Sequence, residues 1–436
     1  MSALDELNRT ILLCRDHVSD ELSDAEIRRH FQSLRILCIS DRRNLSSHSG
    51  QTALVTFVSL LSRMGMQVAL KIPEAPIISP QPPLSGSSSL RDALVTSSET
   101  LVTGATVHID SAFDPDLIFA LGDTDIGYAS PPCWRLSGEA WSGSLAANGI
   151  AKAQGWNTDW PVGAMVSAAM AASEAFKFVI RQLRLRHPAD QIFFEVSRLC
   201  SWSFGSLPVP DQDLDLGEID IVSAGAISQA ALYALLRLPG VRMNGRIFDD
   251  DLTVASNLNR NMLTAKSDVG RAKVQVVAQR CRSKFMLEPI AGRYIGESVE
   301  IGKLAHRVLV GVDDIPSRWK VQRLAPGWIA VSGTSHFNVS SSAHSLGEPC
   351  SGCLHPVDDP GVNPIPTVSF VSFWAGLVMS VRLLREALSR PYSRNHQHLW
   401  LTPLRMDSLH AAMWSPVPAV RDCPVQCSAS RSNLAA

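Results

Sequence analysis

The order of apolar segments repeats along the chain, and this repeat restricts the fold more than any other feature. In the first half, apolar runs are typical of buried strands at 35–40, 67–71 and 116–125, with a helical run at 50–65. In the second half the same order returns as strands at 218–225, 245–251 and 306–314, with a helix at 228–240. Strands that alternate with helices predict parallel sheets, so we expect two α/β units.

Two further pairs of segments support an internal duplication. WRLSG (134–138) follows the third strand of the first half as WIAVSG (328–333) does in the second. Each half then reaches a long apolar helix, at 161–183 and at 369–388. We therefore predict two doubly wound, Rossmann-like domains that pack as a pseudo-dimer within one chain.

Domain boundaries follow from a linker. At 436 residues and 45% hydrophobic content, the chain is too long for one typical domain and has ample material for two cores. Residues 201–217 mix proline, glycine, serine and aspartate without periodicity, as interdomain connections do. We expect a first domain at 1–200 and a second at 218–436.

The charge balance disfavours two classes of partner. Forty basic and forty-one acidic residues give a formal charge of -1, which offers no electrostatic footprint for nucleic acid or anionic lipid. The N-terminus lacks a basic region followed by an apolar core, and the apolar runs are interrupted short of a membrane span. We expect a soluble cytoplasmic protein with no nucleic-acid and no membrane partner.

A candidate nucleotide site begins in the second half, where a strand runs through SAGAIS into a helix whose N-terminal amides can face a phosphate. Gly225 stands where backbone must approach a ligand. Ser223, Ala226 and Ser228 occupy places where a dinucleotide fingerprint prefers glycine or a small residue, so this loop alone is a weak signal. Asp249 follows Gly225 by 24 positions, at a strand end where a carboxylate can accept hydrogen bonds from ribose hydroxyls.

The residues after this strand carry a family resemblance. The strand ends in Asp249, Asp250 and Asp251, and the following segment carries Val254, Ser256, Asn257, Leu258, Asn259, Arg260, Asp268, Gly270 and Lys273. This arrangement resembles the ubiquitin-activating-enzyme superfamily, including the thiamine- and molybdopterin-pathway adenylyltransferases of ThiF and MoeB type. That superfamily has D-x-D, a run close to V-x-x-S-N-L-N-R, and then D-x-G-x-x-K. A solvated polar loop is the alternative interpretation.

The resemblance implies an ATP site in which Asp249 holds the ribose and Asp251 supports the site. Asn257, Arg260 and Lys273 would contact the phosphates. Adenylation brings a carboxylate against the α-phosphate, so cations must neutralise the charge that develops.

The resemblance also implies a magnesium ion. The aspartate that holds magnesium in the family ends a later strand and precedes an arginine by five residues, and Asp313 and Arg318 fit this pattern. Asp314 stands where the family usually has asparagine. Carboxylate oxygens and water are the ligands that magnesium prefers.

A second resemblance lies at the N-terminus, where LNRTILL (7–13) is similar to the family's Y-N-R-Q-I-L-L. The arginine of that motif reaches across the dimer into the opposite ATP site, so Arg9 would complete the site of the second half. A surface arginine on an amphipathic helix is the alternative. After 67–71 the first half continues IPEAP, without paired aspartates, S-N-L-N-R or a matching lysine. It therefore resembles an inactive adenylation domain that serves as the structural partner.

Four of the nine cysteines form two close pairs, Cys350 with Cys353 and Cys423 with Cys427. Four thiolates in two pairs suit tetrahedral zinc, and the family's own metal site is C-x-x-C followed by a distant C-P-x-C-like pair. The second pair here has one extra residue between its cysteines. Unrelated thiols, or redox chemistry at the first pair, are the alternatives. Structural zinc is the prediction, and it would pin the C-terminal segment to the second half.

The other cysteines bear on acyl transfer. Many ubiquitin-activating enzymes carry a nucleophilic cysteine in the crossover loop, but residues 357–370 contain none. The isolated cysteines, mostly in apolar settings typical of buried inert thiols, are Cys14, Cys38, Cys133, Cys200 and Cys281. Either the enzyme stops at the acyl-adenylate, or another cysteine acts, with Cys353 beside His355 as the candidate. His344 is expected on the surface or in a loop.

Together these features predict an enzyme that uses ATP, Mg2+ and Zn2+ to adenylate the C-terminal carboxylate of a ubiquitin-like protein. The acyl group would pass to a thiol or to a ubiquitin-conjugating-type enzyme. A fused inactive and active half resembles the ubiquitin-activating enzymes of eukaryotes more than the homodimeric sulfur-carrier enzymes. The degenerate phosphate loop and the compact length resemble the activating enzymes of bacterial ubiquitin-like conjugation (Bil-type) operons linked to antiviral defence. Adenylation of a sulfur carrier or peptide, and a noncatalytic scaffold of a conjugation complex, are the alternatives. Pairing of two chains as a homodimer stays open.

Overall fold

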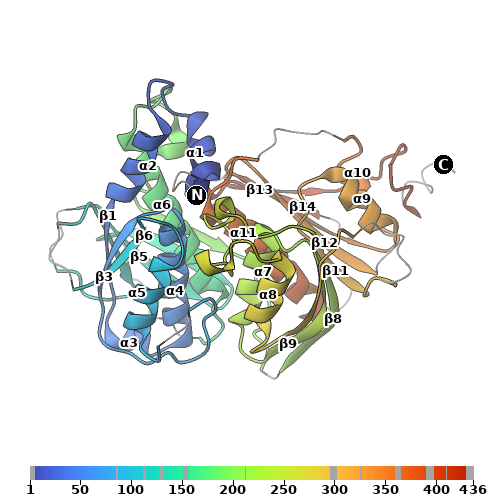
Figure 1. Ribbon diagram of the computed structural model, residues 1–436, viewed down its shortest axis with the longest axis horizontal. Helices are drawn as coiled ribbons and strands as arrows, with labels where there is room; N and C mark the ends of the chain where they lie inside the picture. Colours follow the sequence, from blue (N-terminus) through green and yellow to red (C-terminus); the bar gives the residue numbers. More distant parts are fainter. Residues whose placement is uncertain are drawn as a thin grey trace.

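Two sheets with the same strand order form the framework of the protein (Figure 1). The computed structural model describes residues 5–84, 87–110, 114–127, 131–150, 156, 158–211, 213–294, 302–324, 327–358, 365–388, 397–408 and 410–428. Within these residues the first sheet has the order β3-β2-β1-β4-β5-β6-β7 and the second the order β10-β9-β8-β11-β12-β13-β14-β15. The predicted pair of Rossmann-like units is confirmed, because the second sheet follows the first strand by strand and adds β15 at its edge.

In each sheet the first five strands are parallel and the later ones antiparallel. The strands of the first sheet are β1 (Arg35–Ile39), β2 (Gln67–Lys71), β3 (Thr106–Ile109), β4 (Leu117–Leu121), β5 (Cys133–Glu139), β6 (Ser142–Ala147) and β7 (Leu199–Ser203). Those of the second are β8 (Leu214–Val222), β9 (Val241–Phe248), β10 (Met286–Ile290), β11 (Arg307–Val310), β12 (Trp328–Ser335), β13 (Asn338–Ser345), β14 (Gln397–Leu401) and β15 (Ala412–Pro416). Parallel strands place their carboxyl ends at one edge, where ligands bind in such folds.

The helices connect these strands in chain order. They are α1 (Asn8–Arg15), α2 (Asp24–Ser33), α3 (Arg42–Leu45), α4 (His48–Arg63), α5 (Leu90–Glu99), α6 (Val162–Gln182), α7 (Ala226–Leu236), α8 (Lys273–Cys281), α9 (Ile315–Arg323), α10 (Ser351–Leu354) and α11 (Ser369–Leu388). Short 3-10 turns occur at Asp5–Leu7, Gln191–Phe193, Ala255–Asn257, Lys266–Asp268 and Pro403–Arg405. The predicted helices at 50–65, 161–183, 228–240 and 369–388 correspond to α4, α6, α7 and α11.

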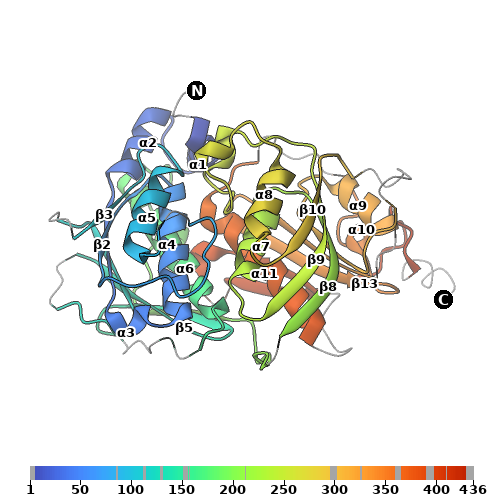
Figure 2. The same ribbon diagram turned by 60° about the horizontal axis from the view of Figure 1, so that its bottom comes forward.

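Four of these helices, α4, α6, α7 and α11, pack against one another between the two sheets (Figures 1 and 2). A single hydrophobic core runs through both halves, with Phe57, Phe176, Tyr233 and Phe373 among its buried residues. The α7–α11 contact is close enough to require glycine: a Cβ on Gly376 would lie 2.4 Å from the Ile227 carbonyl oxygen. Burial of this shared apolar surface holds the halves together.

α6 is the one helix in the described part of the chain that is long and apolar enough to cross a membrane, and 94% of its apolar window is buried inside the protein. It is a core helix. Its polar side chains are paired, since the ammonium group of Lys177 contacts the carboxylate of Glu174 and donates a 2.9 Å hydrogen bond to the Phe194 carbonyl.

Two buried arginines tie each half to the other. Arg63, at the end of α4, donates to three carbonyl oxygens of the segment that follows β9, at Leu258 (2.6 Å), Met262 (3.0 Å) and Thr264 (3.0 Å). In the reverse direction Arg237, at the end of α7, donates to the Pro82 carbonyl in the segment that follows β2 (2.8 Å). The proline-rich segment after β2 therefore lies against the other half.

The connection between the halves is shorter than the predicted linker 201–217. Residues 201–203 belong to β7 and residues 214–217 to β8. The local pattern of these residues lacks the alternation typical of strands. Pairing with β6 and β9 nevertheless makes them strands, because a neighbouring strand can impose extended structure on a weak local preference.

Candidate active site

The turn between β8 and α7 places backbone amides at the carboxyl edge of the second sheet. Ser223 has a φ of 91°, the left-handed region that usually requires glycine. Its hydroxyl accepts a 3.0 Å hydrogen bond from the Gly225 amide, and its own amide donates to the Phe248 carbonyl at 2.9 Å. These bonds hold Ser223 in a left-handed backbone conformation that glycine adopts more easily. The first-turn amides of α7, which have no partner within a helix, are left at the candidate site.

Asp249 joins the ends of β8 and β9. One carboxylate oxygen accepts a 2.7 Å hydrogen bond from the Ala224 amide, and the other accepts a 2.9 Å bond from the Asp251 amide. A carboxylate has about four lone-pair sites, so two hydrogen bonds leave capacity for the hydroxyls of a ribose. The predicted position of Asp249 beside the loop of Gly225 is the position that the structure shows.

Lys273 and Asp251 form an ion pair next to Asp249. The Lys273 Nζ lies 2.5 Å from Asp251 Oδ2, and the Lys273 amide donates to the Asp251 carbonyl at 3.1 Å. The lysine side chain is 10% exposed and the aspartate side chain 65% exposed. Lys273 is the first residue of α8, so the start of this helix holds the cation beside the end of β9.

The loop after β9 folds around Asn257 and Arg260. The Asn257 side-chain oxygen accepts a 3.0 Å hydrogen bond from the Val254 amide. Arg260 donates to the Asn259 side-chain oxygen at 2.9 Å and to the Ser256 carbonyl. Burial, together with the positive charge of Arg9, lowers the pKa of Arg260 to about 10. It stays a cation near neutral pH in a desolvated position where an anion would be attracted strongly.

Arg9 reaches this place from the first half. Its guanidinium donates a 3.2 Å hydrogen bond to the Ile365 carbonyl, and its own carbonyl accepts a 3.2 Å bond from the Thr367 amide. The Asn259 side chain donates to the Thr10 hydroxyl at 3.0 Å. Burial lowers the pKa of Arg9, and the Asp313 carboxylate opposes that shift. Helix α1 is thus tied to both loops that border the candidate site.

Asp313 follows β11 at the same edge of the sheet. Within the described residues its carboxylate makes no hydrogen bond and no ion pair, although Arg9, Arg260 and Arg318 feel its charge. Arg318 is buried and donates to the Val312 carbonyl at 3.1 and 3.0 Å, so it holds the loop that carries Asp313. Asp314 caps α9 by accepting a 2.8 Å bond from the Ser317 amide. Asp313 is therefore free to coordinate a cation.

These residues surround one cavity of about 510 Å3. The predicted residues that line it are Arg9, Gly225, Asp249, Asp251, Asn257, Arg260, Lys273 and Asp313. The same cavity is also lined by residues that no sequence motif indicates, namely Asn261, Arg293, Tyr294, Thr334 and Thr367. Arg293 and Tyr294 follow β10, a strand that carries no clear apolar alternation, and Thr367 lies just before α11. The available signal for these residues is their position next to the end of a strand or the start of a helix that borders the cavity.

The first half shows how the corresponding place is filled. Thr124 stands three residues after β4, as Asp313 stands three residues after β11. Its hydroxyl donates to the Leu121 carbonyl at 2.6 Å and lies 3.1 Å from the Asn44 amide nitrogen. Asn44 belongs to α3, a turn between β1 and α4 that has no counterpart between β8 and α7. A Cβ on Gly122 would lie only 2.2 Å from the Asn44 side-chain oxygen, so α3 occupies the space at this strand end.

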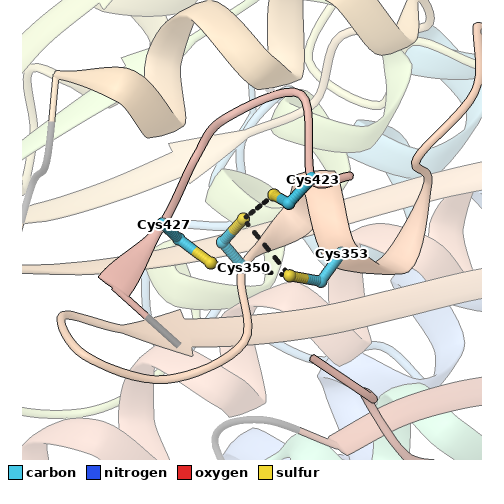
Figure 3. A group of neighbouring side chains, drawn as sticks. All are labelled: Cys350, Cys353, Cys423 and Cys427. Carbon is cyan, nitrogen blue, oxygen red and sulfur yellow. Dashed lines mark hydrogen bonds between the residues drawn. The ribbon is translucent and has the colours of Figure 1, made fainter. Parts of the chain in front are cut away.

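The two predicted cysteine pairs meet at the far end of the second half, where the labelled side chains converge (Figure 3). All four sulfur atoms lie within 4.8 Å of one another. Cys350 Sγ is 3.4 Å from Cys423 Sγ, and Cys353 Sγ is 3.5 Å from Cys427 Sγ. Tetrahedral zinc with Zn–S bonds of about 2.3 Å separates its sulfurs by roughly 3.8 Å. The cluster therefore fits a zinc site with four cysteine ligands, despite the extra residue in the second pair.

The cysteine cluster is linked to the candidate active site through α9. Arg323 of α9 donates to the Pro424 carbonyl at 2.8 Å, and the Trp319 indole donates to the His355 carbonyl at 2.9 Å. The same helix begins beside Asp313. Cys353 is 2% exposed within the cluster, which disfavours it as an acyl acceptor. His344, expected on the surface or in a loop, instead lies in β13 with 0% exposure. Its ring nitrogens are satisfied there by contacts with the Ser342 hydroxyl and the Pro349 carbonyl.

Comparisons with known proteins identify partial relatives. Residues 34–187 match the family described as BilD N-terminal domain. A protein of Sinorhizobium fredii named "Uncharacterized protein y4jF" is 30% identical over 149 residues, which are 33% of this chain and 29% of that protein. The chain therefore spans less than a third of the length of this curated relative.

Solved structures resemble the fold over about half of the chain. E. coli MccB, in a structure with MccA-N7isoASN, is 16% identical with a TM-score of 0.40 over 48% of this chain and 66% of MccB. A structure of E. coli MccB with ATP has 16% identity and a TM-score of 0.39 over 48% and 65% of the two chains. PaaA has 16% identity and a TM-score of 0.36 over 46% and 64%.

Proposed function

We propose that the second half adenylates the C-terminal carboxylate of a ubiquitin-like protein with ATP and releases pyrophosphate. The observation that carries this proposal is the assembly around one cavity of a carboxylate suited to a ribose, three cations and a free aspartate. These groups come from four separate segments, which makes a chance polar loop a poor explanation. A cavity of about 510 Å3 lies within the range of small-molecule sites.

Each residue has a role that its contacts support. Asp249 accepts the ribose hydroxyls while its bonds to the turn before α7 hold it in place. In the reaction a carboxylate oxygen of the protein substrate attacks the α-phosphorus, and the bond to the pyrophosphate oxygen breaks. Arg9, Arg260 and Lys273 neutralise the charge that moves onto the phosphate oxygens. Magnesium, held by the Asp313 carboxylate, would screen the remaining triphosphate charge.

The first half serves in this proposal as the structural partner of the catalytic half. Its residues 1–200 supply Arg9, and α3 fills the place at the end of β4 where a nucleotide would need room. Residues 218–436 form the catalytic domain. Zinc at the four cysteines would fasten the C-terminal segment against α9 and so support the loop of Asp313.

The acyl group would leave for a nucleophile on another protein. All nine cysteines are described, and outside the cluster the exposures of Cys14, Cys38, Cys133, Cys200 and Cys281 are 7% or less. Burial raises the pKa of each of these five thiols, that of Cys133 to about 11. A neutral buried thiol is a poor nucleophile. We therefore assign the acceptor to a partner, with a ubiquitin-conjugating-type thiol as the chemistry that fits.

The protein substrate would bind on the outer face of β13 to β15. Trp400 of β14 is paired with Met413 of β15, and these side chains are 36% and 60% exposed. Ser340 of β13 pairs with Trp400 on one side and with Gly333 of β12 on the other. An exposed Trp and Met side by side on one sheet face are typical of a protein-binding surface.

The match of residues 34–187 to the BilD N-terminal domain family supports the narrower placement among bacterial ubiquitin-like conjugation proteins, acting in the cytoplasm where ATP is available. The defence role stays part of the proposal.

Partner-dependent exchange of labelled pyrophosphate into ATP tests the function. The wild-type chain should catalyse exchange when a ubiquitin-like protein ending in a free carboxylate is added, and Asp313→Ala should abolish it. Exchange with a short peptide but not with the ubiquitin-like protein would support a peptide adenylyltransferase instead. If neither substrate supports exchange, the proposal is overturned, and a noncatalytic scaffold of a conjugation complex is the supported alternative.

A further inference from the structure

A second cavity of about 340 Å3 lies between the two halves, at the end of α7 opposite the candidate active site. His48, at the start of α4, lines it from the first half, together with Asp159. Arg237, at the end of α7, and Lys284, just before β10, line it from the second half. The rest of the wall is mostly proline, leucine and isoleucine. The cavity therefore combines a mostly apolar wall with two cationic side chains.

Arg237 is buried in this wall with 1% exposure. It donates to the Tyr233 carbonyl at 3.0 Å and to the Pro82 carbonyl at 2.8 Å, and its guanidinium lies 3.2 Å from the centre of the Tyr233 ring. The Nε–H has no hydrogen-bond partner among the described residues. An unpaired buried donor on a charged group destabilises the folded protein, and a ligand acceptor would remove that cost.

Lys284 brings a second positive charge to the same wall. Its ammonium group donates to the Leu238 carbonyl and lies 3.3 Å from the Leu236 carbonyl, at the end of α7. Burial, followed by the charge of Arg237, lowers the pKa of Lys284 to about 8. The two cations therefore repel each other. The helix C-terminus supplies only about half a negative charge, which does not balance two full positive charges.

No carboxylate within the described residues forms an ion pair with Arg237 or Lys284. His48 is used by other groups, since Nε2 contacts the Arg237 carbonyl at 2.6 Å and Nδ1 contacts the Ser79 hydroxyl at 2.9 Å. The single carboxylate in the lining is that of Asp159, which is exposed and whose charge acts on His48. Buried charges in proteins are normally paired, so the wall retains an uncompensated positive charge.

The position of the cavity has a parallel in the candidate active site. The candidate active site lies at the N-terminus of α7 and takes Arg9 from the opposite half. The second cavity lies at the N-terminus of α4, the counterpart of α7, and takes Arg237 and Lys284 from the opposite half. In both places cations from one half line a space that also borders the other half. Unpaired cations in the second cavity indicate an anionic ligand there as well.

We propose that this cavity binds a small organic molecule with one carboxylate and an apolar body, and that the molecule bridges the two halves. The carboxylate contacts Arg237 and Lys284, and the apolar body lies against Ile78 and Leu236. A volume of about 340 Å3 lies within the range of small-molecule sites. An adjoining cavity shares Ile78 with this one and gives the apolar end room to extend.

Calorimetric titration of the full-length protein tests the proposal with octanoate, its uncharged analogue octanamide, and inorganic phosphate. Octanoate should bind at least about tenfold more tightly than either of the others. Octanamide binding as tightly would show that charge plays no part, and phosphate binding as tightly would show that the apolar body plays none. Either result overturns the proposal.

Variants locate the bound molecule. Lys284→Gln should weaken octanoate binding about tenfold, and Asp159→Asn should strengthen it because a repelling carboxylate is removed. Both positions tolerate change because Asp159 is exposed and Lys284 is incompletely buried. Arg237→Lys supplies a further test that keeps the charge but removes the Nε donor, and it should also weaken binding. Loss of binding in Lys273→Gln, with Lys284→Gln unchanged, would place octanoate in the other cavity and overturn the proposal.

Discussion

The Lys273 ammonium nitrogen lies 2.5 Å from the Asp251 carboxylate, at the mouth of the cavity that also holds Asp249. The aspartate is largely exposed and the lysine is not, so a phosphate arriving from solvent can replace the carboxylate as the partner of the lysine. The pair thus holds the cation in position before the nucleotide binds. This arrangement limits the freedom that Lys273 loses on binding.

Substitutions in this pair should separate a role of Lys273 in the reaction from a role of the ion pair in stabilising the fold. Lys273→Ala should lower partner-dependent ATP–pyrophosphate exchange by about 10²-fold, because one cation at the reacting phosphates is lost. Asp251→Asn should have a much smaller effect, since the lysine remains. Steady-state exchange at saturating ATP measures both. Matched losses in the two variants would mean that the ion pair only stabilises the fold.

Arg9 should act across the junction between the halves. Arg9→Ala should reduce kcat for exchange by about 10²-fold, while Arg9→Lys should restore only part of the loss because a lysine cannot reproduce the guanidinium geometry. Arg15→Ala provides the matched control on the same helix, since Arg15 pairs with Asp24 away from the cavity. Exchange by Arg9→Ala at the rate of the control would refute a role for this arginine.

Zinc should be present at one equivalent per chain and should stabilise the second half. Cys350→Ser should remove the metal and lower the melting temperature by on the order of 5–10 °C, because metal binding contributes to folding free energy. Cys38→Ser, in the first sheet, should keep the metal. Metal analysis and thermal unfolding provide the two measurements. A full zinc complement in Cys350→Ser would exclude the four-cysteine site.

The sheet face of Trp400 and Met413 should affect the protein substrate and not ATP. The double change Trp400→Ser with Met413→Ser should raise KM for the ubiquitin-like protein about 10- to 30-fold, as expected for loss of exposed anchor residues. KM for ATP should stay unchanged. Met286→Ser is the control, because Met286 is 80% exposed at the opposite edge of the same sheet. An equal effect of the control would mean that the substrate does not bind on this face.

Lys284 should make the free energy of unfolding depend on pH in the alkaline range. The pKa of Lys284 is about 8 in the folded protein and 10.5 in its ordinary state, so the unfolded chain binds more protons between these values. Stability contributed by this group therefore rises with pH from about 8 to about 10.5, and the cost of burying the charge is present in full below that window. Lys284→Met should abolish this slope in urea unfolding. A slope unchanged from wild type would show that the lysine is solvated.

Local patterns in the sequence determined much of the fold. The apolar runs of QVALK and SFVSFWAGLVMSVRLLREAL mark β2 and α11 with the bounds that the structure shows, because continuous burial imposes an apolar composition. The sequence also predicts that three features lie at the candidate site. These are the turn of Gly225, the carboxylate of Asp249 and the segment from Asn257 to Lys273. They lie near one another in the sequence, and the end of one strand and the start of the next helix bring them to the same edge.

Tertiary structure alone decided the rest. Arg9 and Asp313 are 304 positions apart, and only the packing of α1 against the segments before α11 and after β9 brings them to one cavity. No sequence pattern predicts that the Asn44 side chain occupies the space beside Gly122 at the end of β4. The sequence around Arg237 and Lys284 does not indicate a site. Their charges lie unpaired beside the cavity because the two halves pack against each other there. Sequence patterns record which residues must be buried or placed on a turn, whereas the neighbours of a buried charge depend on distant segments that no local spacing encodes.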